Sequence, residues 1–451
     1  MRILTRLLAC LAALTLGVQP VAAQEILRDA ETEALLQDMV NPLVKAAGLP
    51  AGNVEVVMIN DPTMNAFVAG GQRIYIHSGL INAADNANQV QGVLAHELGH
   101  ITGGHAIRYG EGASSATKIS LLSMLLGIGA ALAGAGEAGM GLMALGQQAA
   151  MGKFLAYTRT EESSADAASV QFLSKAGITG KGSIGFFKKL QNYYFRYGYD
   201  QSDEAGFAQT HPMPGDRVDR LEADFKADPA WDKPPDPALE QRYQRIKAKL
   251  YGYLAKPADT LRAYPEYMTS APARYARAYA YHKEALMDKA VAEADALLAT
   301  EPDNPYFLEL KGQVLLESGK PRDAIDPLRR ATALSNNQPL IASTFGHALI
   351  ATEDPRYFDE AKQVLRSAVT RDRENPFAWY QLGIIYAAQG DMPRARLASA
   401  EQQAMTGRMA EALHSAETAE SALPTGTPDW LRAQDIALQA RAELERQRKR
   451  K

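Results

Sequence analysis

Three of the eight histidines of this chain fall within thirteen positions, in the segment VLAHELGHITGGH. His96 and His100 are four residues apart, so on a helix they lie about 40° apart around the axis and one turn apart along it. Both imidazoles can therefore bind one metal ion. Glu97, next to His96, would project beside the ion, where it can hold a water molecule instead of serving as a ligand. The segment predicts a zinc site on a helix.

The spacing of the segment leaves two choices for a third protein ligand. In the pattern HExxHxxGxxH the ligand would be a histidine at position 106, but Ala106 stands there. The alternative is a glutamate on a later helix, and the segment LAYTRTEESSADAAS offers Glu162. Asp166 follows one helical turn later on the same face, so it can reach the far side of a zinc-bound histidine and fix its tautomer. We therefore expect one Zn²⁺ per chain, bound by His96, His100 and Glu162.

Short strands precede the helix that carries the histidines. Residues 54–60, 65–71 and 73–81 are β-branched or alternate between apolar and polar, as strands do. Residues 86–105 then follow a helical pattern, with apolar residues along one side. His105 lies far around this helix from His96, so we expect it to have a structural role and not to bind the ion.

The C-terminal half contains an internal repeat of about 34 residues. Alanines mark its register at spacings of 34, 37 and 34, with a three-residue insertion near TEDPRY: Ala290, Ala324, Ala361 and Ala395. The segment WYQLGIIY, which starts at Trp379, completes the W-x2-L-G-x2-Y pattern of a tetratricopeptide repeat. We expect about four units from Ala271 onward and a capping helix pair. Such a stack binds extended segments or partner proteins in its concave groove.

Composition and the chain ends define three regions. Residues 1–23 have the pattern of a signal peptide, with two arginines, an apolar run and a small-residue cleavage site, so we expect an exported protein. The only cysteine, Cys10, lies in this leader, which excludes thiol catalysis and disulfides in the mature chain. A proline- and charge-rich stretch then separates a domain with the zinc motif, residues 24–256, from a repeat domain, residues 257–451.

Charge and hydropathy limit the partners of the chain. The formal net charge is −4, and loss of Arg2 and Arg6 with the leader makes it −6, so nucleic acid is not an expected partner. Residues 119–136 carry no charge and are just long enough to span a bilayer. Because both flanks must return to one zinc ion, we favour an apolar hairpin at residues 114–152 that forms a lid over the cleft, with residues 119–152 also able to contact a membrane surface.

These patterns predict an α+β fold, in which a gluzincin-type zinc peptidase domain with a small sheet precedes an all-α repeat domain. The chain resembles the HtpX and CAAX-prenyl-endopeptidase family of zinc metallopeptidases. Between residues 53 and 221 it carries NAFVAGGQRIYIHSGLI, HELGH, RTEESSAD and THPMPGDRVDRL, and its repeats narrow the resemblance to the exported BepA-like branch. Ser163 and Ser164 replace the bulkier residues usual in that family, which affects local packing and leaves the ligand geometry intact.

The resemblance implies a zinc endopeptidase of the bacterial periplasm that degrades outer-membrane proteins or helps to assemble them. Its repeats would contact the outer-membrane assembly machinery. Arg217 matches the arginine of the family and would orient the site. Two roles stay open for His211, because it could stabilise the oxyanion or, as the resemblance allows, occupy the open zinc position in a resting state.

The ligand set also indicates a mechanism and a kind of substrate. Two imidazoles and one carboxylate leave the zinc net positive with an open position, so Glu97 could accept a proton from its bound water and pass it to the leaving amine. In the fold that the resemblance implies, the strand before the zinc helix offers a free edge to which an extended peptide can add, so we expect Asn65, Ala66 and Phe67 to bind substrate. Cleavage would then require unfolded or misassembled chains.

The sequence also allows a non-enzymatic function. The protein could be a periplasmic scaffold or chaperone in which the zinc is structural and the repeats do the binding. In that case Glu97→Gln would leave activity in cells unchanged. The peptidase hypothesis instead predicts a loss of proteolysis with zinc still bound.

Overall fold

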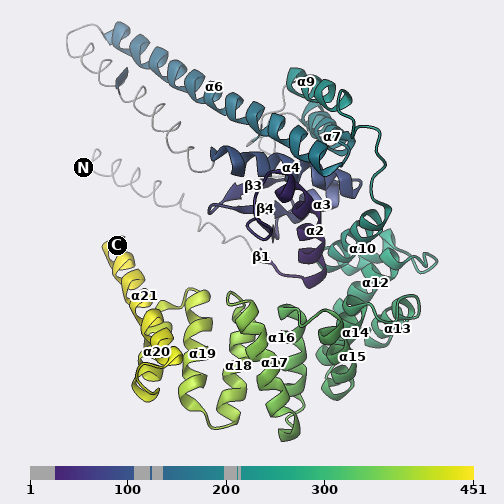
Figure 1. Cartoon of the computed structure of the whole chain (residues 1–451), viewed down its shortest axis with the longest axis vertical. Helices are drawn as coiled ribbons and strands as arrows, with labels where there is room; N and C mark the ends of the chain where they lie inside the picture. The colour runs from purple at the N-terminus through teal and green to yellow at the C-terminus, as the bar shows by residue number, and fades with distance from the viewer. Residues whose placement is uncertain (1–25, 106–121, 124–135, 198–210, 212–214, 451) are drawn as a thin grey trace, which may run out of the picture. The chain divides into compact units, whose positions relative to one another are not determined.

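The computed structural model describes residues 26–105, 122–123, 136–197, 211 and 215–450 (Figure 1). The signal-peptide prediction lies outside the described residues, as does most of the predicted apolar hairpin. No helix among the described residues is both long enough and apolar enough to cross a bilayer. The chain divides into two compact units. The first contains Ile26–Leu27 and Val40–Lys233, and the second contains Arg28–Met39 and Pro234–Lys451.

A small mixed sheet belongs to the first unit, and its strand order is β1-β2-β4-β3. The strands are β1 (Ile26–Leu27), β2 (Glu55–Ile59), β3 (Ala66–Ala69) and β4 (Arg73–His77). β2 and β4 run parallel, while β1 and β3 pair antiparallel to them on the two outer sides. β3 is therefore an edge strand, with one row of backbone groups not paired within the sheet.

In the first unit, the helix that carries the HELGH segment, α4 (Ala87–Gly103), packs against two other helices, α6 (Gly136–Ala176) and α7 (Lys181–Tyr197). The unit also contains α3 (Ser78–Ala83) and α9 (Gly215–Lys226), and α2 (Ala30–Ala46) starts in the second unit and ends in the first. Figure 1 shows α4 between the sheet and α6, in agreement with its contacts to β3, β4, α6 and α7. The apolar and the polar sides of α4 are thus both covered.

The predicted strand at residues 73–81 is wrong in its second half. Only Arg73–His77 are extended, and Ser78 begins the short helix α3. The chain turns there because the Ser78 hydroxyl donates to the Asp61 carbonyl, and because Gly79 packs directly on the Pro62 backbone. Residues 78–81 are buried whether they form a strand or a helix, so their apolar character does not distinguish the two.

The second unit contains stacked helix pairs. Two helices lead into the stack, α10 (Pro237–Leu254) and α11 (Pro257–Ala263). The pairs are α12 (Ala271–Lys283) with α13 (Met287–Leu298), α14 (Pro305–Glu317) with α15 (Pro321–Leu334), α16 (Pro339–Ala351) with α17 (Phe358–Arg371), α18 (Pro376–Ala388) with α19 (Met392–Met405), and α20 (Met409–Ala422) with α21 (Pro428–Arg450). The start at Ala271, the four repeats and the closing pair agree with the sequence pattern, and the insertion forms the 3₁₀ turn η2 (Pro355–Tyr357). The predicted fold class is confirmed.

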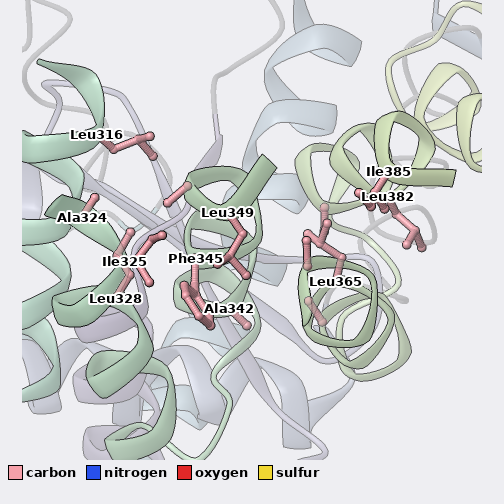
Figure 2. Packing of buried hydrophobic residues seen from close by; sticks show 14 of the residues in the cluster. Leu316, Ala324, Ile325, Leu328, Ala342, Phe345, Leu349, Leu365, Leu382 and Ile385 are labelled. Atoms are coloured by element: carbon pink, nitrogen blue, oxygen red, sulfur yellow. The ribbon is translucent and has the colours of Figure 1, made fainter. Parts of the chain in front are cut away.

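One cluster of buried apolar residues connects the three repeats from α14 to α19 (Figure 2). Glycines on the first helix of two pairs allow close approach, because a Cβ atom on Gly312 would lie 2.4 Å from Leu328 Cγ and one on Gly346 would lie 2.6 Å from Leu365 Cγ. Gly383 holds the same place in the complete sequence match, yet its nearest neighbour would be 3.5 Å away. Close helix packing therefore requires glycine in the two degenerate repeats, whereas Gly383 has room for a methyl group.

Residues Arg28–Met39 are part of the second unit, which the sequence did not indicate. Ala30 packs with Leu308, Ala331 and Ile341 of the repeats. Polar side chains nearby form a buried network that includes these ion pairs: Lys249 Nζ to Asp29 Oδ2 at 2.5 Å, and Arg245 Nε to Glu31 Oε1 at 2.8 Å. The Tyr275 hydroxyl also donates to Glu31 Oε2 at 2.8 Å. Each carboxylate of this network therefore has a cationic partner.

Candidate metal centre

Helix α4 carries two of the predicted ligands and is buried along most of its length. Asn86 caps its N-terminus, because its side-chain oxygen accepts a hydrogen bond from the Gln89 backbone N–H at 3.0 Å. Every residue from Ala87 to His100 is buried, and His96 and Glu97 are 0% exposed. Ionisable side chains are expensive to bury unless they are paired or bind a metal, so this placement points to a shared binding role.

Helix α6 supplies the third predicted ligand and its neighbour. Glu162 and Asp166 lie one turn apart on the buried face of α6 and are 5% and 7% exposed. The two helices approach closely where Gly99 of α4 meets Ala165 of α6, since a Cβ atom on Gly99 would lie only 2.7 Å from the Ala165 carbonyl oxygen. Gly99 therefore sets the separation of the helices that carry the ligands.

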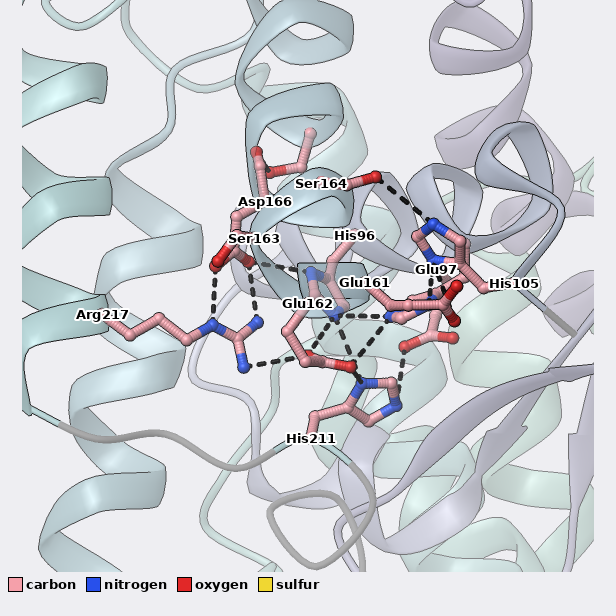
Figure 3. A network of polar contacts seen from close by, with 12 residues as sticks. His96, Glu97, His105, Glu161, Glu162, Ser163, Ser164, Asp166, His211 and Arg217 are labelled. Carbon is pink, nitrogen blue, oxygen red and sulfur yellow. Dashed lines mark hydrogen bonds and ion pairs between the residues drawn. The ribbon is translucent and has the colours of Figure 1, made fainter. Parts of the chain in front are cut away.

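Four side chains converge between these helices: His96, His100, Glu162 and His211 (Figure 3). Each offers one nitrogen or oxygen atom, and the four atoms lie within 4.8 Å of one another. His96 Nε2 lies 3.1 Å from His100 Nε2 and 3.3 Å from His211 Nδ1. Glu162 Oε1 lies 3.3 Å from His100 Nε2 and 3.0 Å from His211 Nδ1.

These separations fit one zinc ion. Atoms bound tetrahedrally at about 2.0–2.2 Å from zinc lie about 3.3–3.6 Å from one another, which is close to the four distances given above. Imidazole nitrogen and carboxylate oxygen are also the donors that zinc commonly takes in peptidases. The residues present can therefore hold the metal that the HELGH segment predicted.

Asp166 contacts the first of these candidate ligands, His96, and Arg217 contacts Asp166. Asp166 Oδ1 lies 3.0 Å from His96 Nδ1, so it fixes a hydrogen on that nitrogen and leaves Nε2 free to face the other donors. Arg217, on α9, donates to Asp166 from Nε at 2.6 Å and from Nη2 at 2.8 Å. Its Nη1 lies 2.8 Å from Glu162 Oε2. Burial alone would raise the pKa of Asp166, but the hydrogen bonds from Arg217 and His96 lower it to about 2, which keeps the carboxylate charged.

Glu97 differs from the other buried acids of the site. Neither of its carboxylate oxygens accepts a hydrogen bond from any residue that the structure describes. His211 Nε2 lies 3.5 Å from Glu97 Oε1. Burial raises the pKa of Glu97, against the opposing influence of His100 and His96. A buried carboxyl group that accepts no hydrogen bond from the described residues and has a raised pKa is suited to accept and return a proton.

His211 lies at the donor group and not at a distance from it. It is 6% exposed, its Nδ1 faces Glu162 and His96, and its Nε2 faces Glu97. Figure 3 shows the His211 ring below His96 and Glu162. It is thus placed to act as a fourth ligand, one of the two roles left open by the sequence.

A cavity of about 430 Å³ opens on this group. One wall is the end of β3 and the following turn, Phe67–Gly71, and the other is α6 with Tyr157, Thr158 and Glu161. Of the three residues predicted to bind substrate, Phe67 lines the cavity and stacks on Tyr75 at a centroid distance of 5.2 Å. Ala66 is 0% exposed, and Asn65 continues the pairing with β4 by accepting a hydrogen bond from the His77 N–H.

Three residues at this site carry roles that the sequence reasoning missed. Gly99 controls the approach of α6, as described above. His105 is 4% exposed and its Nδ1 lies 2.9 Å from His100 Nδ1, while its Nε2 lies 3.3 Å from the Ser164 hydroxyl. Ser164 therefore contributes more than local packing, because its hydroxyl contacts a histidine beside the site. The one feature of the sequence that could have indicated these contacts is His105, a third histidine shortly after the HELGH segment.

The fold and the donor group define a metallopeptidase domain joined to a helical repeat domain. Residues 30–224 match the model of Peptidase family M48, and residues 275–339 and 346–407 match that of a tetratricopeptide repeat. The chain is therefore a zinc metalloendopeptidase with an M48 catalytic domain followed by tetratricopeptide repeats. These matches confirm the family resemblance and the cofactor expected from the motifs.

The chain also aligns with curated proteins, two of them over most of its length. The chain is 26% identical over 440 residues to the beta-barrel assembly-enhancing protease of Yersinia pestis, an alignment that covers 95% of this chain and 87% of that protein. It is also 26% identical to the protein of the same name from Escherichia coli strain K12, with 82% of this chain and 75% of that protein covered. Metalloprotease YcaL of E. coli K12 is 30% identical over 169 residues, covering 38% of this chain and 60% of that protein.

Proposed function

We propose that this protein is a periplasmic zinc endopeptidase that hydrolyses peptide bonds in unfolded or misassembled envelope proteins, outer-membrane proteins in particular. The observation that carries the proposal is the position of Glu97, which is buried, not hydrogen-bonded by the described residues and directed to the donor group. The names of the two relatives aligned over most of the chain support outer-membrane proteins as the substrate class. The signal-peptide pattern of residues 1–23 supports export.

The side chains of the site divide the chemistry among them. His96, His100 and Glu162 would hold zinc, which when bound acts as a Lewis acid and lowers the pKa of water at its open position. Glu97 accepts a proton at its carboxylate and later returns it to the leaving amine. Asp166 keeps a hydrogen on His96 Nδ1 throughout, and Arg217 keeps Asp166 charged and in place.

The edge strand β3 supports an extended substrate. An unfolded segment can add to the free edge of β3, which would lay its backbone along the cavity wall formed by Phe67–Gly71. A folded protein has no free segment of this kind, so cleavage is restricted to unfolded or misassembled chains. The tetratricopeptide repeats bind client chains or the assembly machinery in their groove, as such stacks do.

His211 acts in this proposal as a resting-state ligand that substrate must displace. Its Nδ1 is already within the donor group, 3.3 Å from His96 Nε2, which favours this role over the oxyanion role. Removal of the ring in His211→Ala would then speed up the digestion of an unfolded protein. Slower digestion by the variant would instead assign the oxyanion role to His211.

The proposal is tested by digestion of an unfolded outer-membrane β-barrel protein with the mature enzyme. Glu97→Gln should retain zinc and lose about 10²–10⁴-fold in rate, the range typical of a general base. Glu222→Gln is the matched control, because Glu222 lies on α9 and pairs with Lys188 away from the donor group. A Glu97→Gln enzyme that digests the substrate at the wild-type rate would refute the peptidase mechanism and favour the scaffold alternative.

A further inference from the structure

The two α4 histidines present the same ring nitrogen to the donor group, but their other nitrogens have different partners. His96 Nδ1 faces the carboxylate of Asp166 at 3.0 Å. His100 Nδ1 faces a third imidazole, that of His105, at 2.9 Å. We propose that His105 is a positioning residue that holds the tautomer and orientation of His100, as Asp166 does for His96. This inference rests on the proposed metal centre.

The end of α4 is built so that His105 can reach back to His100. Gly104 ends the helix in the left-handed region at a φ of 66°, and its N–H donates to the carbonyls of His100 and Ile101. Glycine adopts this conformation without strain, and it reverses the chain at the helix end. The His105 ring then lies over Gly103, where a Cβ atom would come within 2.2 Å of His105 Nε2. Two consecutive glycines thus make the turn and leave room for the ring.

The geometry of the two rings is that of a buried hydrogen bond. The centroids of the His100 and His105 rings lie 4.9 Å apart, with an angle of 79° between the planes, and His105 is 4% exposed. Two imidazole nitrogens at 2.9 Å must share one hydrogen, because two lone pairs or two hydrogens would repel.

The direction of that hydrogen bond follows from the donor group. His100 needs the lone pair of Nε2 for the metal, so its hydrogen is on Nδ1 and is donated to His105 Nδ1. The hydrogen of His105 is then on Nε2, which can donate to the Ser164 hydroxyl at 3.3 Å. Glu161 Oε2, at 4.0 Å from His105 Nδ1, is beyond hydrogen-bonding distance and does not compete for that nitrogen. Ser164 lies on α6, two residues after Glu162, so this chain of hydrogen bonds connects both ligand helices.

The required chemical property of His105 is therefore a hydrogen-bond acceptor at Nδ1. Loss of such a partner of a metal-binding histidine typically costs about 10–100-fold in metal affinity or activity. His105→Phe keeps a ring of similar size but has no acceptor. His105→Asn is the conservative variant, because its side-chain oxygen can accept the hydrogen of His100 Nδ1.

The test measures the zinc affinity of the full mature chain by competition with a chelator, and the visible absorption spectrum of the cobalt(II)-substituted protein. We expect His105→Phe to raise the zinc Kd about 10–100-fold and to shift the cobalt bands, while KM changes little and kcat falls. His105→Asn should recover most of the affinity and the wild-type spectrum. Ser164→Ala should give a smaller loss in the same direction, and Ser163→Ala, whose hydroxyl donates to the Arg159 carbonyl of its own helix, should give none.

Three outcomes would overturn the inference. The first is a wild-type zinc Kd and a wild-type cobalt spectrum in His105→Phe. The second is an equal loss of zinc affinity in His105→Asn and His105→Phe, which would indicate that the ring acts by packing alone. The third is an equal loss of zinc affinity in Ser164→Ala and Ser163→Ala. Failure of the proposed function is distinguishable, because it would appear in the wild type as an absence of zinc binding or as full activity of Glu97→Gln. Thermal unfolding of each variant with zinc identifies any variant that loses zinc affinity because it misfolds. If His105→Phe misfolds, the zinc affinities of His105→Asn and Ser164→Ala test the inference in its place.

Discussion

A methyl group added to Gly99 should separate the two helices that carry the metal ligands. Gly99 lies between His96 and His100 in sequence, and Ala165 lies between Glu162 and Asp166. A Cβ atom on Gly99 would lie 2.7 Å from the Ala165 carbonyl oxygen and 2.8 Å from its Cα atom. Both contacts are with backbone, so no side-chain rotation can relieve them.

The size of the effect follows from these distances. Ordinary van der Waals contact begins near 3.4 Å, so Gly99→Ala requires α4 and α6 to separate by about 0.7 Å. Metal–ligand distances tolerate only about 0.2 Å, so Glu162 would no longer complete the donor group in its present position. We expect the zinc Kd to rise by about 10–100-fold or more and the free energy of unfolding to fall by about 1–3 kcal/mol.

A second glycine of the same helix provides the control. Gly92 lies against α7, where a Cβ atom would come 2.7 Å from Ser183 Cα, and it is one helical turn before the first ligand. Gly92→Ala should lose a similar amount of stability, measured by thermal unfolding, but should keep its zinc affinity, measured by chelator competition. Wild-type zinc affinity in Gly99→Ala, or equal losses of affinity in both variants, would refute the reasoning.

Two further predictions concern the second unit. Gly346→Ala should lower the free energy of unfolding by about 1–3 kcal/mol, because its Cβ would overlap Leu365. Gly383→Ala should raise the free energy of unfolding by up to about 1 kcal/mol, because the added methyl group has room and alanine favours the helix. Shifts of Tm with the same sign in both variants would contradict this prediction. Burial raises the pKa of the partly exposed Glu309 to about 8, although Lys249 lowers it. The unfolded chain releases this proton near pH 4.5 and the folded chain near pH 8, so stability falls as pH rises between these values. Glu309→Gln removes this contribution, and a difference in Tm between wild type and Glu309→Gln that stays constant from pH 5 to pH 8 would be evidence against it.

Local periodicity was enough to predict the two pairs of side chains that α4 and α6 bring to the candidate metal centre. His96 with His100, and Glu162 with Asp166, are pairs one helical turn apart, so their shared faces follow from 3.6 residues per turn. The tetratricopeptide register was readable for the same reason, because each repeat places its small residues at fixed positions. These features depend on the chain within a few turns of the residue concerned.

Features that depend on distant parts of the chain were not predictable in this way. Gly99 matters only because Ala165 packs on it, and His105 reaches His100 only because Gly104 reverses the chain at the helix end. The partnership of Glu31 with Tyr275 joins positions 244 residues apart, and no local pattern signals it. The strand assigned to residues 78–81 failed because burial, which the apolar pattern does report, is common to strands and helices.

The charges at the centre connect the folding of this unit with the binding of its metal. Glu162 and Asp166 are buried carboxylates, and Arg217 is the buried cation that pairs with both. One positive charge facing two negative charges leaves an excess of negative charge, which without the metal ion is met by a proton on His96, because against the effect of burial the hydrogen bonds with Asp166 and Glu162 raise the pKa of His96 to about 9. A bound divalent cation offsets this excess and tolerates the negative charge that Glu97 acquires when its proton leaves, so the same ion that supplies the Lewis acid also stabilises the packing of α4 against α6.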